Sequence, residues 1–429
     1  MNPWISTLRR HRVVRASALA IFLFGFAGAA TVPYQALVGI QELGLSDSQY
    51  ALIALCSSIA NVILSIGFGL WSDRFQSYRR PLIFVSSFGI LGFGMIWAAP
   101  SALSFTIAMI GPLALFYATN SMLFGNVRAH IASFDPAEAD VVNALMRMMI
   151  SLSWVLVPGA VGLALVGQPS MIGAWAIAAV LSAACLCTII FGLEPDNPRP
   201  RPPELSPEAA AIPTGGTGTS ALAPTAGRAD RPVQVRAAGA SLSGIAQILH
   251  PAILSKVLGV ALISQVLHVN SAVMPLILTG QAAGEADNVG LIVGMVAVLE
   301  VIFMFYWASA TRRISVVKAL MITSALYLVY LVAIAFSTAV WQIWVASVVA
   351  GFAAAGIISL PISYLLDLIC DRPGLSASLI AVNMFLGGAI GAGVFALGTW
   401  IGGYPAASVL AGVAGVLGAG LLIVQEKRA

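Results

Sequence analysis

The sequence predicts an all-α membrane protein with twelve transmembrane helices in two six-helix halves. Only 9% of its 429 residues are charged and 59% are hydrophobic, whereas about 25% of residues are charged in soluble domains. The apolar residues form runs of about twenty, which is the length a helix needs to cross a hydrocarbon core about 30 Å thick. A soluble fold cannot bury this much apolar surface, so the chain crosses the membrane many times.

Twelve apolar spans are expected, six before a polar interruption and six after it. The first six cover residues 14–40, 48–71, 81–99, 103–126, 141–166 and 170–192. The second six cover residues 252–279, 288–310, 317–336, 339–365, 374–400 and 404–424. The first span follows an arginine-rich start, as a cleaved signal peptide would, but it is longer than a typical signal core. We therefore expect it to stay as a helix.

The basic residues predict the orientation. With the N-terminus inside, twenty of the twenty-one Lys and Arg residues fall on the cytoplasmic side, and the exception is Arg147 within a span. Positive charge is retained on the cytoplasmic side of membranes. We therefore expect a multi-pass protein of the bacterial inner membrane with both termini in the cytoplasm. The net charge of +4 is explained by this asymmetry, so it does not indicate a nucleic-acid partner.

The polar interruption divides the chain into an N-terminal half (1–193), a linker (194–250) and a C-terminal half (251–429). The linker contains nine prolines and a Gly-Thr-Gly-Thr-Ser stretch. Such a segment buries too little apolar surface to fold, so a flexible cytoplasmic tether is predicted. The four cysteines lack metal-ligand or disulfide spacing, so neither a metal site nor another cofactor is expected.

A charged turn separates the second and third spans. It reads Gly-Leu-Trp-Ser-Asp-Arg from Gly69 to Arg74 and continues to Arg79-Arg80-Pro81. This order resembles the loop between the second and third helices of transporters of the major facilitator superfamily. The resemblance implies a cytoplasmic latch made of Gly69, Asp73, Arg74, Arg79 and Arg80. A plain topology signal is the alternative, and the second-half counterpart, Trp307 to Arg313, lacks the acidic residue.

Two ionisable residues lie inside predicted helices, where a charge costs at least a few kcal/mol. Arg147 is in the fifth span and Glu300 is near the middle of the eighth. In the superfamily these helices face each other across the two halves, so the resemblance implies an interdomain pair that carries protons. Arg147 could instead extend to the headgroups, and the pair could be a permanent pin between helices.

Neutral polar side chains on several spans outline a candidate substrate cavity. They are Tyr34, Gln35, Asn61, Asn120, His268, Asn270, Tyr364 and Asn383. Each alone is as well explained by hydrogen bonds between helices. Together, amides, hydroxyls and aromatic rings with little charge favour a neutral polyhydroxylated solute. Pro158-Gly159 is expected to break the fifth helix and to act as a hinge or close-packing site.

Several motifs together resemble the bacterial sugar efflux transporter family. They are Met146-Arg147 to Trp154 with Pro158, Met274-Pro275-Leu276, Gly290 to Glu300, and Leu366-Asp367-Leu368 to Asn383. The resemblance implies export of a sugar in exchange for protons, with Val273 replacing an acidic residue that this family often carries.

Other functions are kept as alternatives. The sequence has no nucleotide-binding loop, which argues against direct use of ATP. Export of an amphiphilic drug-like compound and a sensor that has lost transport both stay open. An enzyme acting on lipid-linked substrates is not expected, because the acidic cluster of Asp135, Glu138 and Asp140 is interpreted as a solvated loop. The expected partners are a sugar-like small molecule, protons and membrane lipid.

Overall fold

The computed structural model describes residues 10–75, 78–131, 134–193, 251–368 and 373–427. Within these ranges the secondary structure is helical, with no strand. The first half contains α2 (Arg12–Thr31), η1 (Val32–Tyr34), η2 (Leu37–Glu42), α3 (Asp47–Phe75), α4 (Arg79–Ala98), α5 (Ala102–Ile110), α6 (Pro112–Ile131), α7 (Pro136–Ala164) and α8 (Gly173–Gly192). The second contains α10 (Pro251–Thr279), α11 (Asp287–Ala310), α12 (Val316–Ala335), α13 (Val340–Asp367) and α14 (Pro373–Glu426).

The predicted number of membrane crossings is confirmed once α14 is counted as two. Eleven helical runs in the described ranges are long and apolar enough to cross a membrane. The last run lies in α14, whose 54 residues would measure about 80 Å as one straight helix. Its backbone is not helical at Gly402 and Gly403, and Gly403 has a φ of 73°, which glycine adopts without strain. The chain turns there, so α14 crosses twice.

Two other predicted spans are less regular than expected. The fourth span is split into α5 and α6 at Gly111, because Pro112 has no backbone N–H to continue the first helix. The Ser101 hydroxyl accepts from the Ser104 amide and starts α5. The first span ends in a 3-10 turn that contains Pro33 and then a π-helix, instead of one regular helix.

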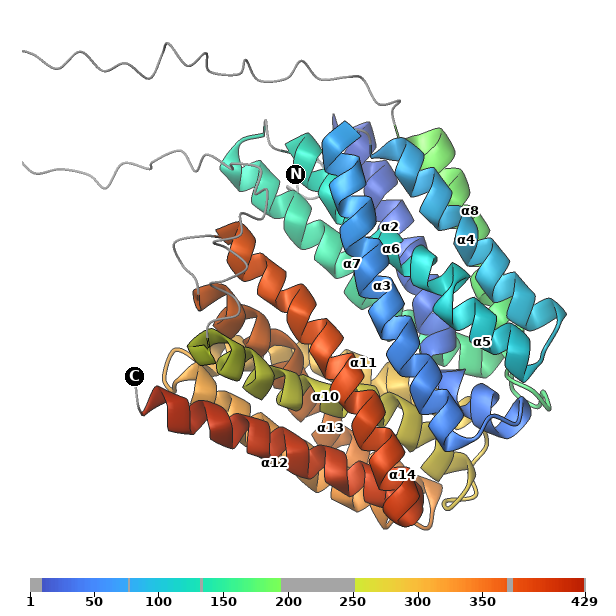
Figure 1. The fold of residues 1–429 in the computed structure, drawn as a ribbon, viewed down its shortest axis with the longest axis vertical. Coiled ribbons are helices and arrows are strands. Elements are labelled where there is room, and N and C mark those ends of the chain that lie inside the picture. The colour runs from blue at the N-terminus through green and yellow to red at the C-terminus, as the bar shows by residue number, and fades with distance from the viewer. Residues whose placement is uncertain (1–9, 76–77, 132–133, 194–250, 369–372, 428–429) are drawn as a thin grey trace, which may run out of the picture.

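The helices form two bundles, α2 to α8 and α10 to α14, drawn in blue to green and in yellow to red (Figure 1). In the first bundle α8 packs on α2 and α4, and in the second α14 packs on α10 and α12. The bundles meet mainly where α7 packs on α11 and α3 on α14. Residues 194–250, the predicted linker, lie outside the described residues. The division at 193 and 251 therefore stays a prediction.

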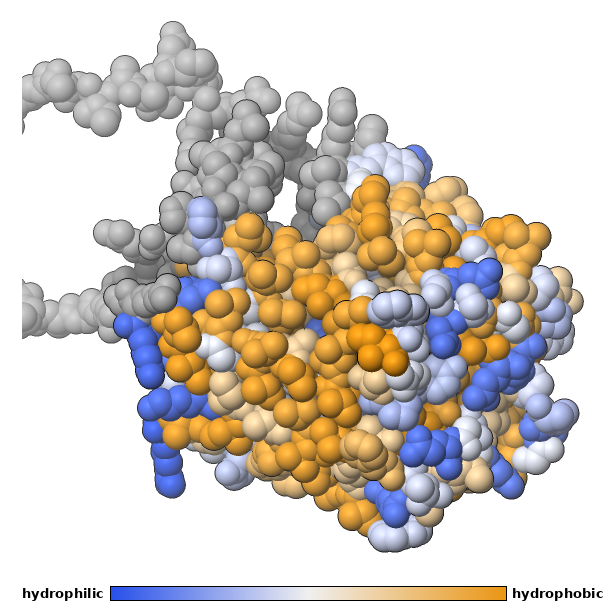
Figure 2. All heavy atoms as spheres, turned by 60° about the horizontal axis from the view of Figure 1, so that its bottom comes forward, coloured by the Kyte–Doolittle hydropathy of each residue, from blue (hydrophilic) through white to orange (hydrophobic). Residues whose placement is uncertain are grey.

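We call the side of the bundles where α2 begins and α14 ends the termini side, and the opposite side the far side. That α2 begins on the side where α14 ends agrees with an even number of crossings (Figure 1). Figure 2 shows a broad apolar surface with hydrophilic residues gathered toward its two edges. Large apolar side chains such as Phe305, Trp341 and Trp400 are exposed. The molecule is therefore a multi-pass membrane protein that places an apolar belt against lipid.

Candidate functional site

The closest approach of the two bundles is a crossing of α7 and α11 near the far side. A Cβ atom added to Gly290 would collide with the Pro158 carbonyl oxygen and with the Tyr34 hydroxyl. One added to Gly162 would lie 2.7 Å from the Asp287 carbonyl oxygen. The two backbones therefore touch without intervening side chains, as small residues permit between membrane helices.

Pro158 does not break α7, contrary to the prediction. The helix continues from Pro136 to Ala164 with Pro158 inside it. The Pro158-Gly159 pair serves close packing instead, because its backbone lies against Gly290 and Gly294 of α11. Membrane helices tolerate an internal proline where neighbouring groups compensate for the missing hydrogen bond.

The remaining polar and aromatic contacts between the bundles also lie on the far side. In the part of the chain that the structure describes, Gln41 hydrogen-bonds Thr279 at 3.1 Å and the Tyr404 hydroxyl donates to Asp47 at 3.0 Å. The Tyr50 and Phe395 rings are 5.8 Å apart between centroids. The structure is therefore a conformation closed on the far side.

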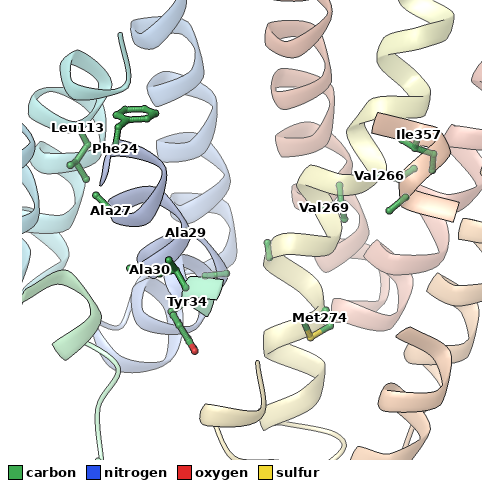
Figure 3. Packing of buried hydrophobic residues seen from close by; sticks show 14 of the residues in the cluster. Phe24, Ala27, Ala29, Ala30, Tyr34, Leu113, Val266, Val269, Met274 and Ile357 are labelled. Atoms are coloured by element: carbon green, nitrogen blue, oxygen red, sulfur yellow. The ribbon is translucent and has the colours of Figure 1, made fainter. Parts of the chain in front are cut away.

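Tyr34 is part of this closure. Its side chain is fully buried, and its hydroxyl donates to the Pro158 carbonyl oxygen at 3.5 Å. Figure 3 shows Tyr34 beside Ala29 and Ala30, with its hydroxyl pointing away from them. Tyr364 lies three residues from the termini-side end of α13. One small solute cannot contact both tyrosines, so the eight predicted cavity residues do not form a single site.

Three of the predicted residues lie closer together in the first bundle. Gln35, Asn61 and Asn120 are all partly buried. Asn61 Nδ2 donates to the Ala114 carbonyl oxygen at 3.2 Å, which joins α3 to α6. Asn120 Oδ1 is buried and has no hydrogen-bond partner among the described residues. Asn61 lies on α3, Asn120 on α6 and Gln35 directly after η1, so the three side chains come from three segments of the first bundle.

The predicted residues of the second bundle mostly have partners. Asn383 Nδ2 donates to the Ser264 hydroxyl at 3.1 Å, and Asn270 Oδ1 accepts from the Tyr330 hydroxyl at 2.9 Å. His268 is exposed, and Gly387 and Gly391 of α14 lie beside it. Asn270 thus fits the alternative interpretation, in which polar groups join helices. Asn383 fits it through Nδ2 only, because its Oδ1 is buried without a partner among the described residues.

Arg147 and Glu300 do not form the predicted ion pair in this structure. Within the described ranges the single carboxylate pair is Glu138 with His11, at 3.2 Å. Arg147 is exposed on α7 and Glu300 is half-buried on α11. Val155 of α7 meets Gly294 of α11 at one level of the crossing. At 1.5 Å per residue, Arg147 lies about 12 Å from that level along α7 and Glu300 about 9 Å along α11, both toward the termini side. Their depths match, but no contact joins them.

Glu300 lies near Tyr327, which was not predicted from the sequence. Its carboxylate is close enough to Tyr327 to act on it electrostatically. Tyr327 and Tyr330 are fully buried, with ring centroids 5.2 Å apart. Their spacing of three residues in α12 is a usable signal, because it places two hydroxyls on one face of a helix.

The predicted latch is only partly described. The side chains of Asp73 and Arg74, and the surroundings of Gly69, lie outside the described residues. Arg79 Nη2 donates to the Ile190 carbonyl oxygen at 2.7 Å, and Arg80 is exposed. Arg79 therefore binds the end of α8 within its own bundle. The latch between the bundles stays a prediction.

The acidic cluster also differs from the expectation of a solvated loop. Glu138 is half-buried, and its carboxylate accepts from His11 Nε2 at the start of α2. It therefore holds α7 to α2. No group of three or more His, Cys, Asp or Glu residues that could bind a metal ion occurs in the described part of the chain.

Comparisons with known proteins agree with this architecture. The family model described as Major Facilitator Superfamily matches residues 17–279. A Deinococcus radiodurans protein described as "Putative sugar efflux transporter" is 27% identical over 302 residues, which are 68% of this chain and 67% of that protein.

Solved structures with the same fold include several transporters. The nucleoside transporter NupG has a TM-score of 0.74 at 12% identity, with 100% of both chains covered. The peptide transporter POT in complex with sulfate has a TM-score of 0.70 at 15% identity, covering 97% of this chain and 94% of that one. A bacterial homologue of the human lysosomal transporter Spinster, in an inward-facing and occupied conformation, has a TM-score of 0.69 at 11% identity, covering 98% and 97%.

Proposed function

Because the chain belongs to the Major Facilitator Superfamily, and is a transporter and not an enzyme, we propose that it exports a sugar or a related small neutral solute in exchange for protons. The observation that carries the proposal is the neutral chemistry of the first bundle. Gln35, Asn61 and Asn120 supply amides there, and the Asn120 oxygen is buried without a partner among the described residues. An unpaired buried amide costs about 1–3 kcal/mol, which a hydroxyl of the solute would recover.

The relative's name supports the same solute class, since that protein is described as a sugar efflux transporter. Neutral amides favour hydroxylated solutes over ions, because a buried ion needs an opposite charge beside it.

Proton coupling is assigned to Glu300. It is an ionisable group in the middle of α11, where a permanent charge is costly, and the buried Tyr327 lies near it. In the closed state seen here Glu300 has no ion pair in the described ranges. We infer that Arg147 approaches it in another state, so that the affinity of Glu300 for a proton changes during the cycle. The Asp73 and Arg74 latch would stabilise the state that is open on the far side.

The orientation belongs to the same proposal. The excess of Lys and Arg on the termini side favours a cytoplasmic location for that side in the bacterial inner membrane. The far-side closure then corresponds to an inward-facing conformation. Residues 194–250 would be a cytoplasmic tether between the halves.

A second candidate function is export of amphiphilic drug-like compounds. Met148 and Met384 are 45% and 64% exposed on α7 and α14, and flexible thioethers suit varied apolar ligands. A membrane sensor without transport is a third candidate, at lower weight.

The test is uptake into inside-out vesicles with an acidic lumen. We expect a labelled neutral sugar from a panel of mono- and disaccharides to accumulate, and nigericin to abolish the accumulation. If the vesicles accumulate amphiphilic dyes but none of the sugars, the second candidate function would be favoured. Sugar binding to the purified protein without accumulation or counterflow would favour the sensor.

A further inference from the structure

The α6 helix has two buried polar groups without partners on one face. The Tyr117 hydroxyl oxygen and Asn120 Oδ1 are both inaccessible to solvent and make no hydrogen bond in the part of the chain described. More than nine in ten buried polar groups in proteins are paired. Residues three apart on a helix are neighbours, with Cβ atoms about 5–6 Å apart. Asn126 Nδ2 of α6 is also buried without a partner among the described residues, but its position in the helix places it on another face. Tyr117 and Asn120 share one face, so a single ligand can pair with both.

The Tyr117 ring is held in place by packing. Its centroid is 6.3 Å from the Phe24 ring in an edge-on arrangement and 5.9 Å from the Phe116 ring. A Cβ atom on Gly28 would touch the ring at 3.9 Å, so α2 approaches it closely. The hydroxyl is therefore held in a fixed position. Because the side chain is already ordered in the folded protein, binding a ligand to it loses little further side-chain entropy.

The surroundings of the two groups are polar and neutral. Thr31 and Gln35 approach the Tyr117 hydroxyl without reaching hydrogen-bond geometry. The Asn61 amide lies on the same side of α6, where it donates to the Ala114 carbonyl oxygen one turn before Tyr117. A charged ligand would lose its hydration here without a counter-ion. An apolar ligand would leave both groups unpaired. A hydroxyl satisfies either group, because it both donates and accepts.

We propose that Tyr117 and Asn120 form a hydroxyl-binding subsite that sets the solute specificity of the first bundle, with two hydroxyls of one sugar ring bound to the phenol and the amide. The inference rests on the proposed function and adds to it a residue, Tyr117, that binds solute directly. The far-side closure begins at Tyr34, three residues after Thr31, so a solute bound at the subsite lies close to the closed end.

The experiment measures counterflow of the labelled sugar in proteoliposomes, with a series of monodeoxy analogues of that sugar as competitors. Counterflow needs no proton gradient, so a failure of coupling does not affect it. The wild-type protein should bind one particular deoxy analogue about tenfold more weakly than the parent sugar, which is the value of one buried hydrogen bond. Tyr117→Phe should bind the parent sugar about tenfold more weakly and that analogue unchanged. Asn120→Leu should lose discrimination at a different hydroxyl.

The control is Tyr306→Phe, which removes a hydroxyl from a half-exposed ring on α11 and should bind every analogue as the wild type does. Thermal unfolding identifies a variant that does not fold. If either Tyr117→Phe or Asn120→Leu fails to fold, the other variant alone tests the subsite. A wild-type protein that moves sugar, with both variants discriminating the analogues normally, would overturn the subsite alone. A wild-type protein that moves no sugar would overturn the proposed function and the subsite with it.

Discussion

The interiors of the two bundles carry different polar groups. In the first, the Tyr117 hydroxyl and the Asn120 oxygen have no partner among the described residues. In the second, Asn270 accepts from Tyr330 and Asn383 Nδ2 donates to Ser264. Five other buried polar atoms there, including Asn383 Oδ1, also have no partner among the described residues. The second bundle also carries Glu300. The proposed function divides the labour between them, with solute recognition in the first bundle and proton transfer at Glu300 in the second.

The two bundles meet at the crossing of α7 and α11. Adding one methyl group there should reduce transport more than any other change considered below. Gly290→Ala places a Cβ atom against the Pro158 carbonyl oxygen and the Tyr34 hydroxyl. Overpacking of this kind costs about 1–3 kcal/mol. Because the cost applies to the closed far side, we expect sugar counterflow to fall about tenfold or more. A cysteine placed at the buried Val161 should react faster with a maleimide added from the far side.

Gly94→Ala is the matched control, because a Cβ atom there meets no atom within 4 Å. If Gly290→Ala retains both wild-type counterflow and wild-type labelling, the crossing is not the far-side gate.

The proposed division of labour would be wrong if Glu300 were required for counterflow as well as for proton-driven accumulation. Glu300→Gln mimics the protonated carboxyl group and removes the exchangeable proton. We expect proton-driven accumulation to be lost, and counterflow, which needs no proton transfer, to stay within about twofold because the first bundle is untouched. Accumulation against a gradient by Glu300→Gln would contradict the carrier role and favour a structural pin.

The contribution of the Tyr330–Asn270 hydrogen bond to the stability of the second bundle can be measured. Asn270→Leu leaves the Tyr330 hydroxyl buried and unpaired, which should cost about 1–3 kcal/mol of stability. Adding Tyr330→Phe to that variant should restore most of the loss, because no polar group is then stranded. Thermal unfolding in detergent ranks the single and double variants. A double variant that unfolds at the temperature expected from additive losses would argue that this bond does not connect α10 and α12.

The smallest effect is expected from the covalent connection between the bundles. Deletion of residues 205–240 leaves about twenty residues between α8 and α10, and an unstructured chain of that length still spans tens of ångströms. We expect transport within about twofold of wild type when the amount of protein in the membrane is matched. Lost transport at a normal membrane level would mean that the linker contributes to the cycle.

Most of the fold could be predicted because hydrocarbon thickness and charge placement constrain it. The spans followed from apolar runs, and the family from short motifs. The pairing of the fifth and eighth helices was implied by the family resemblance. The break at Gly111 was missed because it lies inside one apolar run, although Pro112 was a visible signal. The π-helix from Leu37 to Glu42 has no comparable sequence signature.

The site was harder to predict than the fold. The sequence gives the depth of a residue along its membrane helix, but not the rotation of that helix about its axis. Arg147 and Glu300 do lie at similar depths from the crossing, as their positions in the spans suggest. Which way each helix face points depends on how glycines such as Gly290 and Gly294 let the backbones approach. Asn120 was predicted, whereas Tyr117 was missed, because a tyrosine in an apolar helix usually indicates packing. Its importance comes from a hydroxyl that finds no partner among the described residues, which only coordinates can reveal.

The backbone contact at Gly290 has a consequence for proton leakage. Tyr34, Val157, Val161 and Val289 around it are all buried, and the helices meet with no side chain between them. A continuous file of water molecules, which protons could follow through an idle carrier, has no room at such a contact. Few side chains become ordered when it forms, so the entropy lost at each closing is small. The protein can therefore close this side without ordering many side chains and without leaving a path for protons through the contact.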